Sequence, residues 1–276
     1  MYVIQGVAGP PSAENLARNG NIAFVVGPTG VLVWNTGVTH RHGQALIGQI
    51  LRSVDKPIRL AIISHAFQDV LFGWSAFSEL NIPVWMHASG VALMKQRCLG
   101  CVHRLTELLG EEEMFQTRLA VPDEILTGSR VSMVIGRKVS IIDSGMSSGP
   151  NDLMLFDHET GTLLGGPTVM TDQLLKIRDG RVAGWKTALK QLDALPVKQV
   201  IPDYGSPADA GAIKRTSQYL SDLEAAVTRL LKQGVTLADA VAKAPLPAYA
   251  DWTAYDDSHS QNVHQLYLRL ESRFFN

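Results

Sequence analysis

The sequence predicts a single-domain α/β protein, and three features of the 276-residue chain support this. Strand-like and helix-like segments alternate over about the first 200 residues. The remainder has the apolar spacing of helices. No low-complexity linker and no short-period repeat divides the chain. We therefore expect one domain over residues 1–276, with a helical C-terminal segment over 208–276.

In the first half, each element follows from its apolar pattern. Apolar runs rich in β-branched residues on either side of a Gly-Pro-Thr-Gly turn predict a hairpin over 22–34. Apolar residues at helical spacing predict helices over 41–54 and 70–80. The short apolar runs over 59–63 and 83–87 lie beside these helices and predict strands.

The second half of the chain also alternates strand-like and helix-like segments. A hairpin is expected over 131–143, followed by strands over 153–156 and 162–164, which flank a polar turn. A helix over 182–194 precedes a strand over 198–202, and helices over 209–233 and 237–243 follow. Ser258 is expected to cap a final helix, in which His259 and Asn262 share one face that could point toward the site.

The composition excludes some partners. Charged residues make up 18% of the chain and the formal net charge is −1, so nothing indicates binding to nucleic acid or to a membrane surface. No apolar run is long enough to span a bilayer, and the first residues lack the pattern of a signal peptide. As written, the chain is expected in the cytoplasm, or in the periplasm if an export signal has been removed. The oligomeric state is unknown.

The loop from Ser64 to Val70 is the most informative segment. It follows an apolar strand, and two of its residues fit the H-x-H-x-D-H spacing of a binuclear metal loop, namely His65 and Asp69. Phe67 and Val70 stand where the other two histidines would be. Hydrocarbon side chains have no lone pair to donate to a metal, so the usual chemistry is expected to be lost or changed.

This loop resembles that of the metallo-β-lactamase superfamily, and further landmarks extend the resemblance over about residues 20–207. It implies an αββα sandwich of the metallo-β-lactamase type. Asn35 replaces the aspartate of the family's Asp-Thr-Gly turn, and Met146 replaces the histidine of a Gly-His-Ser/Thr turn. Pro167 stands for the metal-bridging carboxylate. Tyr204 stands for the last histidine, next to an unusual acid, Asp203.

The resemblance thus implies two metal sites, neither of which keeps three ligands. Only His65 and Asp69 remain, as vestigial ligands, so no cofactor is expected, and zinc only if the ligand positions have been matched wrongly. The candidate pocket residues, where strand-end loops should converge, are His65, Phe67, Asp69, Val70, Met146, Pro167, Asp203 and Tyr204.

Cys98 and Cys101, the two cysteines of the chain, form a C-x-x-C motif inside a predicted helix. They are interpreted as structural thiols, as a redox or sensing pair, or as metal ligands together with His103. Arg97-Cys98-x-x-Cys101 also resembles a helical insert of superfamily members associated with quinoprotein and sulfur-oxidation pathways. His40 and His42 form an H-x-H pair, for which a capping or solvated role is favoured over metal binding.

Three functions remain open, and no catalytic residue is assigned. The first is a protein without zinc chemistry, a pseudoenzyme that binds a small molecule or a protein partner. The second is a residual metallo-hydrolase that uses His65 and Asp69 with a weakly bound metal. The third is a thiol redox or sensor protein that acts through Cys98 and Cys101.

Overall fold

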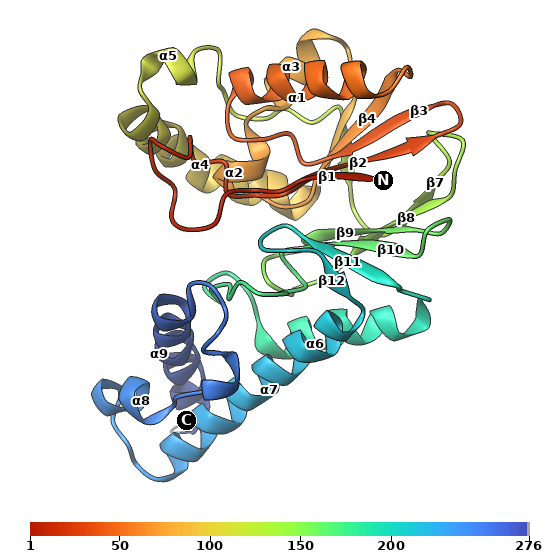
Figure 1. Cartoon of the computed structure of the whole chain (residues 1–276). Helices are drawn as coiled ribbons and strands as arrows, with labels where there is room; N and C mark the ends of the chain where they lie inside the picture. The colour runs from red at the N-terminus through yellow and green to blue at the C-terminus, as the bar shows by residue number, and fades with distance from the viewer. Residues whose placement is uncertain (275–276) are drawn as a thin grey trace.

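The computed structural model describes residues 1–274 and contains two six-stranded sheets that face each other between layers of helices (Figure 1). The first sheet has the order β1-β2-β3-β4-β5-β6 and the second the order β12-β11-β10-β9-β8-β7. This arrangement confirms the predicted αββα sandwich.

The strands of the first sheet are β1 (Tyr2–Ile4), β2 (Ile22–Gly27), β3 (Gly30–Trp34), β4 (Ile58–Ile63), β5 (Val84–His87) and β6 (Glu124–Leu126). Those of the second sheet are β7 (Arg130–Ser132), β8 (Val139–Asp143), β9 (Leu153–Asp157), β10 (Thr162–Gly166), β11 (Gln199–Pro202) and β12 (Ala208–Asp209). From β3 to β6 the pairs are parallel, and in the second sheet only β10 and β11 pair in parallel. The carboxyl ends of β3 and β4 therefore point to the same edge.

The core follows from the two-residue period of the strands. In β2, Ala23 and Val25 face the second sheet, whereas Ile22 and Phe24 face the helices. The core between the sheets is built in the same way from both sides and includes Trp34, Leu60, Ile62, Val139, Ile141, Leu153, Leu155, Leu164 and Ile201. Because the central strands are buried on both faces, they read as continuous apolar runs.

Helices cover the outer face of each sheet (Figure 1). Those of the first half are α1 (His40–Ser53), α2 (Gln68–Leu71), α3 (Trp74–Glu79), α4 (Ala88–Leu109) and α5 (Glu111–Met114). Those of the second half are α6 (Val182–Gln191), η1 (Leu192–Ala194), α7 (Gly211–Lys232), α8 (Leu237–Lys243), η2 (Pro247–Tyr249) and α9 (Tyr255–Phe274). Within the described residues, no helix combines the length and the apolar character that crossing a bilayer requires.

The helix expected over 70–80 is broken into α2 and α3 around Gly73. The backbone of Gly73 lies against the turn after β3, where its amide donates to Gly37 O over 2.9 Å. A Cβ atom at Gly73 would lie 1.9 Å from Thr36 O, so only glycine permits this approach. A long-range contact therefore overrides the local helical pattern.

The final helix begins before the expected cap, because α9 starts at Tyr255 and Ser258 lies within it. His259 and Asn262 share a face as predicted, but they do not point toward the site. His259 Nε2 hydrogen-bonds Ala244 O at 2.7 Å, and Asn262 Oδ1 accepts from Ile177 N at 2.8 Å. These residues instead hold the C-terminal helix to the loops beside it.

Candidate functional site

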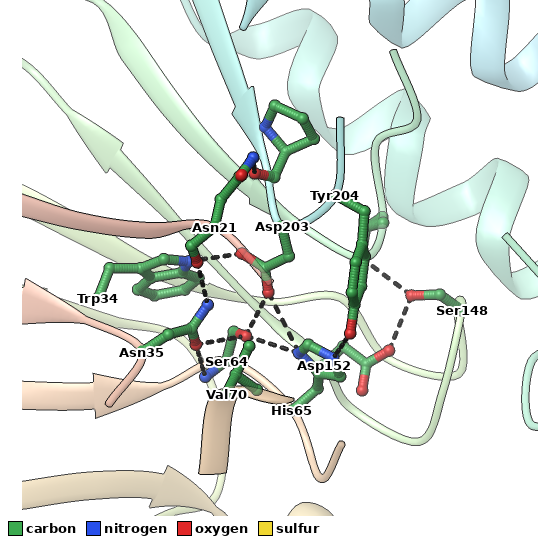
Figure 2. A network of polar contacts seen from close by, with 12 residues as sticks. Asn21, Trp34, Asn35, Ser64, His65, Val70, Ser148, Asp152, Asp203 and Tyr204 are labelled. Atoms are coloured by element: carbon green, nitrogen blue, oxygen red, sulfur yellow. Dashed lines mark hydrogen bonds and ion pairs between the residues drawn. The ribbon is translucent and has the colours of Figure 1, made fainter. Parts of the chain in front are cut away.

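The site lies where loops at the carboxyl ends of β3, β4 and β11 meet, and Figure 2 shows the polar side chains that they bring together. Asn35 follows β3, Ser64 and His65 follow β4, and Asp203 and Tyr204 follow β11. Asn35 has φ of 68°, a left-handed conformation that asparagine tolerates better than most residues. In this turn its Oδ1 accepts from the Ser64 amide at 3.1 Å and its Nδ2 donates to Asn21 O at 3.2 Å.

Asp203 is the centre of this network and is 1% exposed. Its Oδ1 accepts from Trp34 Nε1 at 2.9 Å, and its Oδ2 accepts from Ser64 Oγ at 2.5 Å. His65 Nδ1 lies 3.2 Å from the same Oδ2 and 2.7 Å from Ser64 Oγ. The carboxylate therefore fixes the orientation of the imidazole, as a buried charge requires partners.

His65 continues the network toward the surface. Its Nε2 lies 3.1 Å from the Tyr204 hydroxyl. Burial disfavours a charged imidazole, but the hydrogen bond and charge of Asp203 outweigh it, so the pKa of His65 is raised. The result is a continuous path of polar contacts from Asp203 through His65 to the Tyr204 hydroxyl.

Asp69 and Tyr204, which line the cavity, hold their protons more tightly than usual. Burial raises the pKa of Asp69, and the His65 charge and the Tyr204 hydroxyl offset only part of that effect. Burial and the charges of Asp69 and Asp203 raise the pKa of Tyr204 well above its usual value. The Tyr204 hydroxyl therefore stays protonated and can donate a hydrogen bond.

Asp152 adds a further acidic group to the site and lies between Tyr204 and Ser148 (Figure 2). It is 6% exposed, and its Oδ2 accepts from Ser148 Oγ at 2.7 Å. Burial raises the pKa of Asp152 to about 6, although the His65 charge and the Ser148 hydroxyl lower it in part. Ionisation of Asp152 at neutral pH therefore lowers the free energy of unfolding, because burial disfavours the charged form.

A cavity of about 920 Å³ opens over Tyr204 and Asp69. Its walls come from α2, α4, the N-terminal loop and the segment over 173–179. A neighbouring lobe of about 590 Å³ shares Phe67 and Tyr204 with it and extends to Pro167 and Ser148. Both volumes fall in the range of small-molecule sites.

Basic side chains surround the larger lobe. Arg97 and Arg104, seven residues apart on one face of α4, lie on one side, and Lys176 and Arg178 lie on the other. Asp179 is the shared partner of two of them, with Oδ1 at 2.5 Å from Arg97 Nη1 and Oδ2 at 2.9 Å from Arg178 Nη2. Three arginines and one lysine thus face a cavity with fewer carboxylates.

The residues expected in the pocket occupy different depths. Phe67, Asp69, Pro167 and Tyr204 line one or both lobes. His65, Asp203 and Val70 are buried beneath them. Met146 is 43% exposed and lines neither lobe.

The position of Met146 has a simple cause. Its turn packs under α6, where a Cβ atom at Gly184 would lie 2.0 Å from Met146 O. Ser148, two residues later, is the side chain of this turn that reaches the pocket and Asp152. The loop enters the site at a different residue from the one expected.

The residues present do not fit the zinc centres that the fold suggests. Both ring nitrogens of His65 are engaged in hydrogen bonds, and Phe67, Val70 and Pro167 offer no donor atom. Over the residues that the structure describes, no three or more His, Cys, Asp or Glu side chains are grouped closely enough to hold a metal ion. A polar network closed by Tyr204 occupies the region instead.

The remaining candidates lie apart from this network. Cys98 and Cys101 are free thiols on α4 and line the far wall of the larger lobe. His103 is exposed and pairs with Glu107, so it does not join the cysteines. His40 hydrogen-bonds Ser75 Oγ at 3.0 Å, and the pKa of His42 is lowered to about 4 by burial and by the charge of Arg18. The H-x-H pair thus packs within the fold.

Several contributors were not expected from the sequence. Asp152 lies immediately before an apolar strand, where nothing in the local pattern distinguishes it from a surface residue. Lys176 and Arg178 come from an irregular segment whose position depends on α9. For the basic side chains of the cavity, the one indication in the sequence is the seven-residue spacing of Arg97 and Arg104 around the cysteines.

We compared the sequence and the structure with those of known proteins. No family model matches the sequence, and no curated protein matches it. Among solved structures, a metallo-β-lactamase from Pontibacter korlensis superimposes with a TM-score of 0.62 at 17% identity, over 73% of this chain and 87% of that one. The chain has the metallo-β-lactamase fold.

The stereoselective inverting sec-alkylsulfatase Pisa1 from Pseudomonas sp. has the same fold, with a TM-score of 0.73 at 15% identity over 91% of this chain. A double mutant of that sulfatase gives 0.74 at 15% identity over 92% of this chain. The metallo-β-lactamase-fold chain described here spans about half of the sulfatase chains, 48% in both cases. At these identities the likeness concerns the fold alone.

Proposed function

We propose that this metallo-β-lactamase-fold protein binds a small anionic molecule with an apolar body, without zinc-dependent hydrolysis. The observation that carries the proposal is the basic cavity of about 920 Å³ above the hydrogen-bonded Tyr204. A cavity of this size, with a few polar groups at its floor and mixed walls, is typical of ligand sites.

The preference for an anion follows from the balance of charges. Asp179 is shared between two arginines, and Lys176 pairs with Asp257 at 2.7 Å. Arg104 has no carboxylate partner among the described side chains. Positive charge therefore remains in excess, and arginine side chains are well suited to binding carboxylate, sulfate or phosphate groups.

The apolar body of the ligand would pack against the wall opposite Lys176 and Arg178. Leu93, Leu105 and Leu108 of α4 and Phe67 line this lobe. Phe67 stands where the resemblance implies a metal-binding histidine, and its ring packs edge-on against His65 with 4.5 Å between centroids. A phenylalanine at this position offers no metal ligand and adds apolar surface to the pocket.

Among the fold neighbours, the name sec-alkylsulfatase describes an enzyme that acts on sulfate esters of secondary alcohols. Such an ester has an anionic head on an alkyl body, which is the chemistry that this cavity would favour. We therefore choose an alkyl sulfate as the binding probe.

The proposal is tested by isothermal titration with octan-2-yl sulfate, with octan-2-ol and octyltrimethylammonium as uncharged and cationic comparisons. We expect only the sulfate to bind measurably, without hydrolysis. Arg104→Gln should weaken its binding by about fivefold, as expected for the loss of about 1 kcal/mol from a partly exposed charge. Arg52→Gln, on the exposed end of α1, is the matched control and should leave the affinity unchanged.

Equal binding of the three probes would refute an anion site. An equal effect of Arg104→Gln and Arg52→Gln would show that binding occurs elsewhere.

A further inference from the structure

The two cysteines line the same cavity and are placed to react with each other. Cys98 and Cys101 are three residues apart on α4, so they lie on one face of the helix, one turn apart. Residues at this spacing have Cβ atoms about 5–6 Å apart, and a disulfide holds them about 3.5–4.5 Å apart, so the bond forms with a local shift of the helix backbone together with a change of side-chain rotamer. Both are free thiols and both line the lobe of about 920 Å³.

Their environments differ in a way that suits an attacking and a resolving thiol. Cys98 is 1% exposed, whereas Cys101 is only half-buried and nearer the solvent. Arg104 Nη2 lies 3.8 Å from Cys101 Sγ. A neighbouring guanidinium stabilises a thiolate, which is the nucleophilic form of cysteine.

The charges around Cys101 come from two parts of the chain. Arg97 and Arg104 belong to its own helix, and Lys176, Arg178 and Asp179 face it across the cavity. The hydrogen bond from Cys98, opposed by burial and aided by Arg104, lowers the pKa of Cys101 to about 6. The same hydrogen bond, together with burial, raises the pKa of Cys98.

We propose that Cys101 and Cys98 form a redox-active dithiol that reduces a small anionic disulfide bound in the basic cavity. The proposal rests on the anion site described above and names the class of ligand for it. Cys101 Sγ attacks one sulfur of the disulfide, a mixed disulfide forms, and one small thiolate leaves. Cys98 then loses its proton and attacks Cys101 Sγ, which releases the second thiolate and leaves a Cys98–Cys101 disulfide. One disulfide is consumed and two thiols are produced, so atoms and electrons balance.

The test uses the reduced full-length protein and two disulfides of opposite charge, glutathione disulfide and cystamine. Products are quenched by alkylation and analysed by mass spectrometry. We expect an intramolecular disulfide in the wild-type protein, formed about tenfold faster with glutathione disulfide at low ionic strength, with the difference reduced by added salt. This measurement uses the wild-type protein, so it does not depend on the folding of any variant.

Two variants identify the order of attack. Cys98→Ala should accumulate a stable mixed disulfide with one glutathione, because the resolving thiol is absent. Cys101→Ala should remain unmodified over the same period. The far-ultraviolet circular dichroism of both variants should match that of the wild type.

The outcomes separate this inference from the proposed anion site. Failure of the wild-type protein to form an intramolecular disulfide would overturn the dithiol, and octan-2-yl sulfate binding would then still support the anion site. Equal rates with the two disulfides would overturn the anionic specificity of the reaction. Reaction of Cys101→Ala at the wild-type rate would overturn the assignment of Cys101 as the attacking thiol.

Discussion

At the scale of single residues, the site is governed by a buried polar network. A hydrogen-bonded path from Asp203 through His65 to Tyr204 connects the loops that follow β4 and β11. The network is compatible with a stable fold, because a buried polar group costs little when it is paired.

Asp152 gives this network a measurable pH dependence. Its pKa is raised from 3.8 to about 6 in the folded protein, so the folded state binds more protons than the unfolded state between these values. The free energy of unfolding should therefore fall as pH rises from about 4 to about 6, by about 2 kcal/mol from this group. His65, whose pKa is raised, adds a loss in the same direction as pH rises through its folded pKa.

We predict that Asp152→Asn raises the free energy of unfolding by about 2 kcal/mol at pH 8 and has little effect at pH 4, since asparagine can still accept from Ser148 and carries no charge. Urea denaturation at the two pH values measures the difference. Asp55→Asn, in an exposed loop, is the control and should show no such dependence. The same loss of stability at both pH values would show that Asp152 acts only as a packing group.

At the scale of elements, α9 positions the segment that carries the basic residues Lys176 and Arg178. Asn262 is fully buried, and its Nδ2 donates to Leu175 O at 2.9 Å and to Tyr219 Oη at 3.0 Å. Together with the bond from Ile177 N, these contacts hold the segment over 175–177 against the helix. Helix α9 therefore holds the basic segment of the larger lobe, and its first turn also lines the smaller lobe through Asp257 and Ser258.

We predict that Asn262→Ala lowers the free energy of unfolding by about 2–4 kcal/mol, because two buried polar groups and one half-buried carbonyl lose their partner. Amide hydrogen exchange over 174–179 should accelerate more than exchange in β2 or β3. The matched variant is Gln261→Ala, which removes one exposed hydrogen bond and should cost less than about 0.5 kcal/mol. Unchanged exchange over 174–179 would contradict a positioning role for α9.

Most helices and strands of the fold could be predicted from the sequence because they form from local apolar patterns. The exceptions are places where the local pattern does not decide the structure. Strands β2 to β5 and helix α1 form from local apolar patterns, and they lie within one or two residues of the expected bounds. Around Gly73, a contact with the turn after β3 breaks the helix that the local pattern favours. The start of α9 was misplaced because a serine inside a helix looks the same in sequence as a serine that caps one.

At the scale of the whole molecule, the fold and the chemistry of the site have separate origins. The sandwich depends on strands that are apolar on both faces and not on the residues of the site. This architecture could be inferred from the sequence. The basic cavity could not, because its residues come from α4 and from a loop held by α9, which only the packed structure brings together.

If a polar network stands where a zinc site would lie, the tag-free protein should not retain zinc. The protein is incubated with excess zinc, desalted and analysed by inductively coupled plasma mass spectrometry. We predict retention below about 0.1 zinc per chain, since a catalytic site needs about three protein ligands and they are not grouped here. Retention of about one or two zinc ions per chain, lost in His65→Ala or Asp69→Ala, would contradict this prediction and favour a residual metallo-hydrolase.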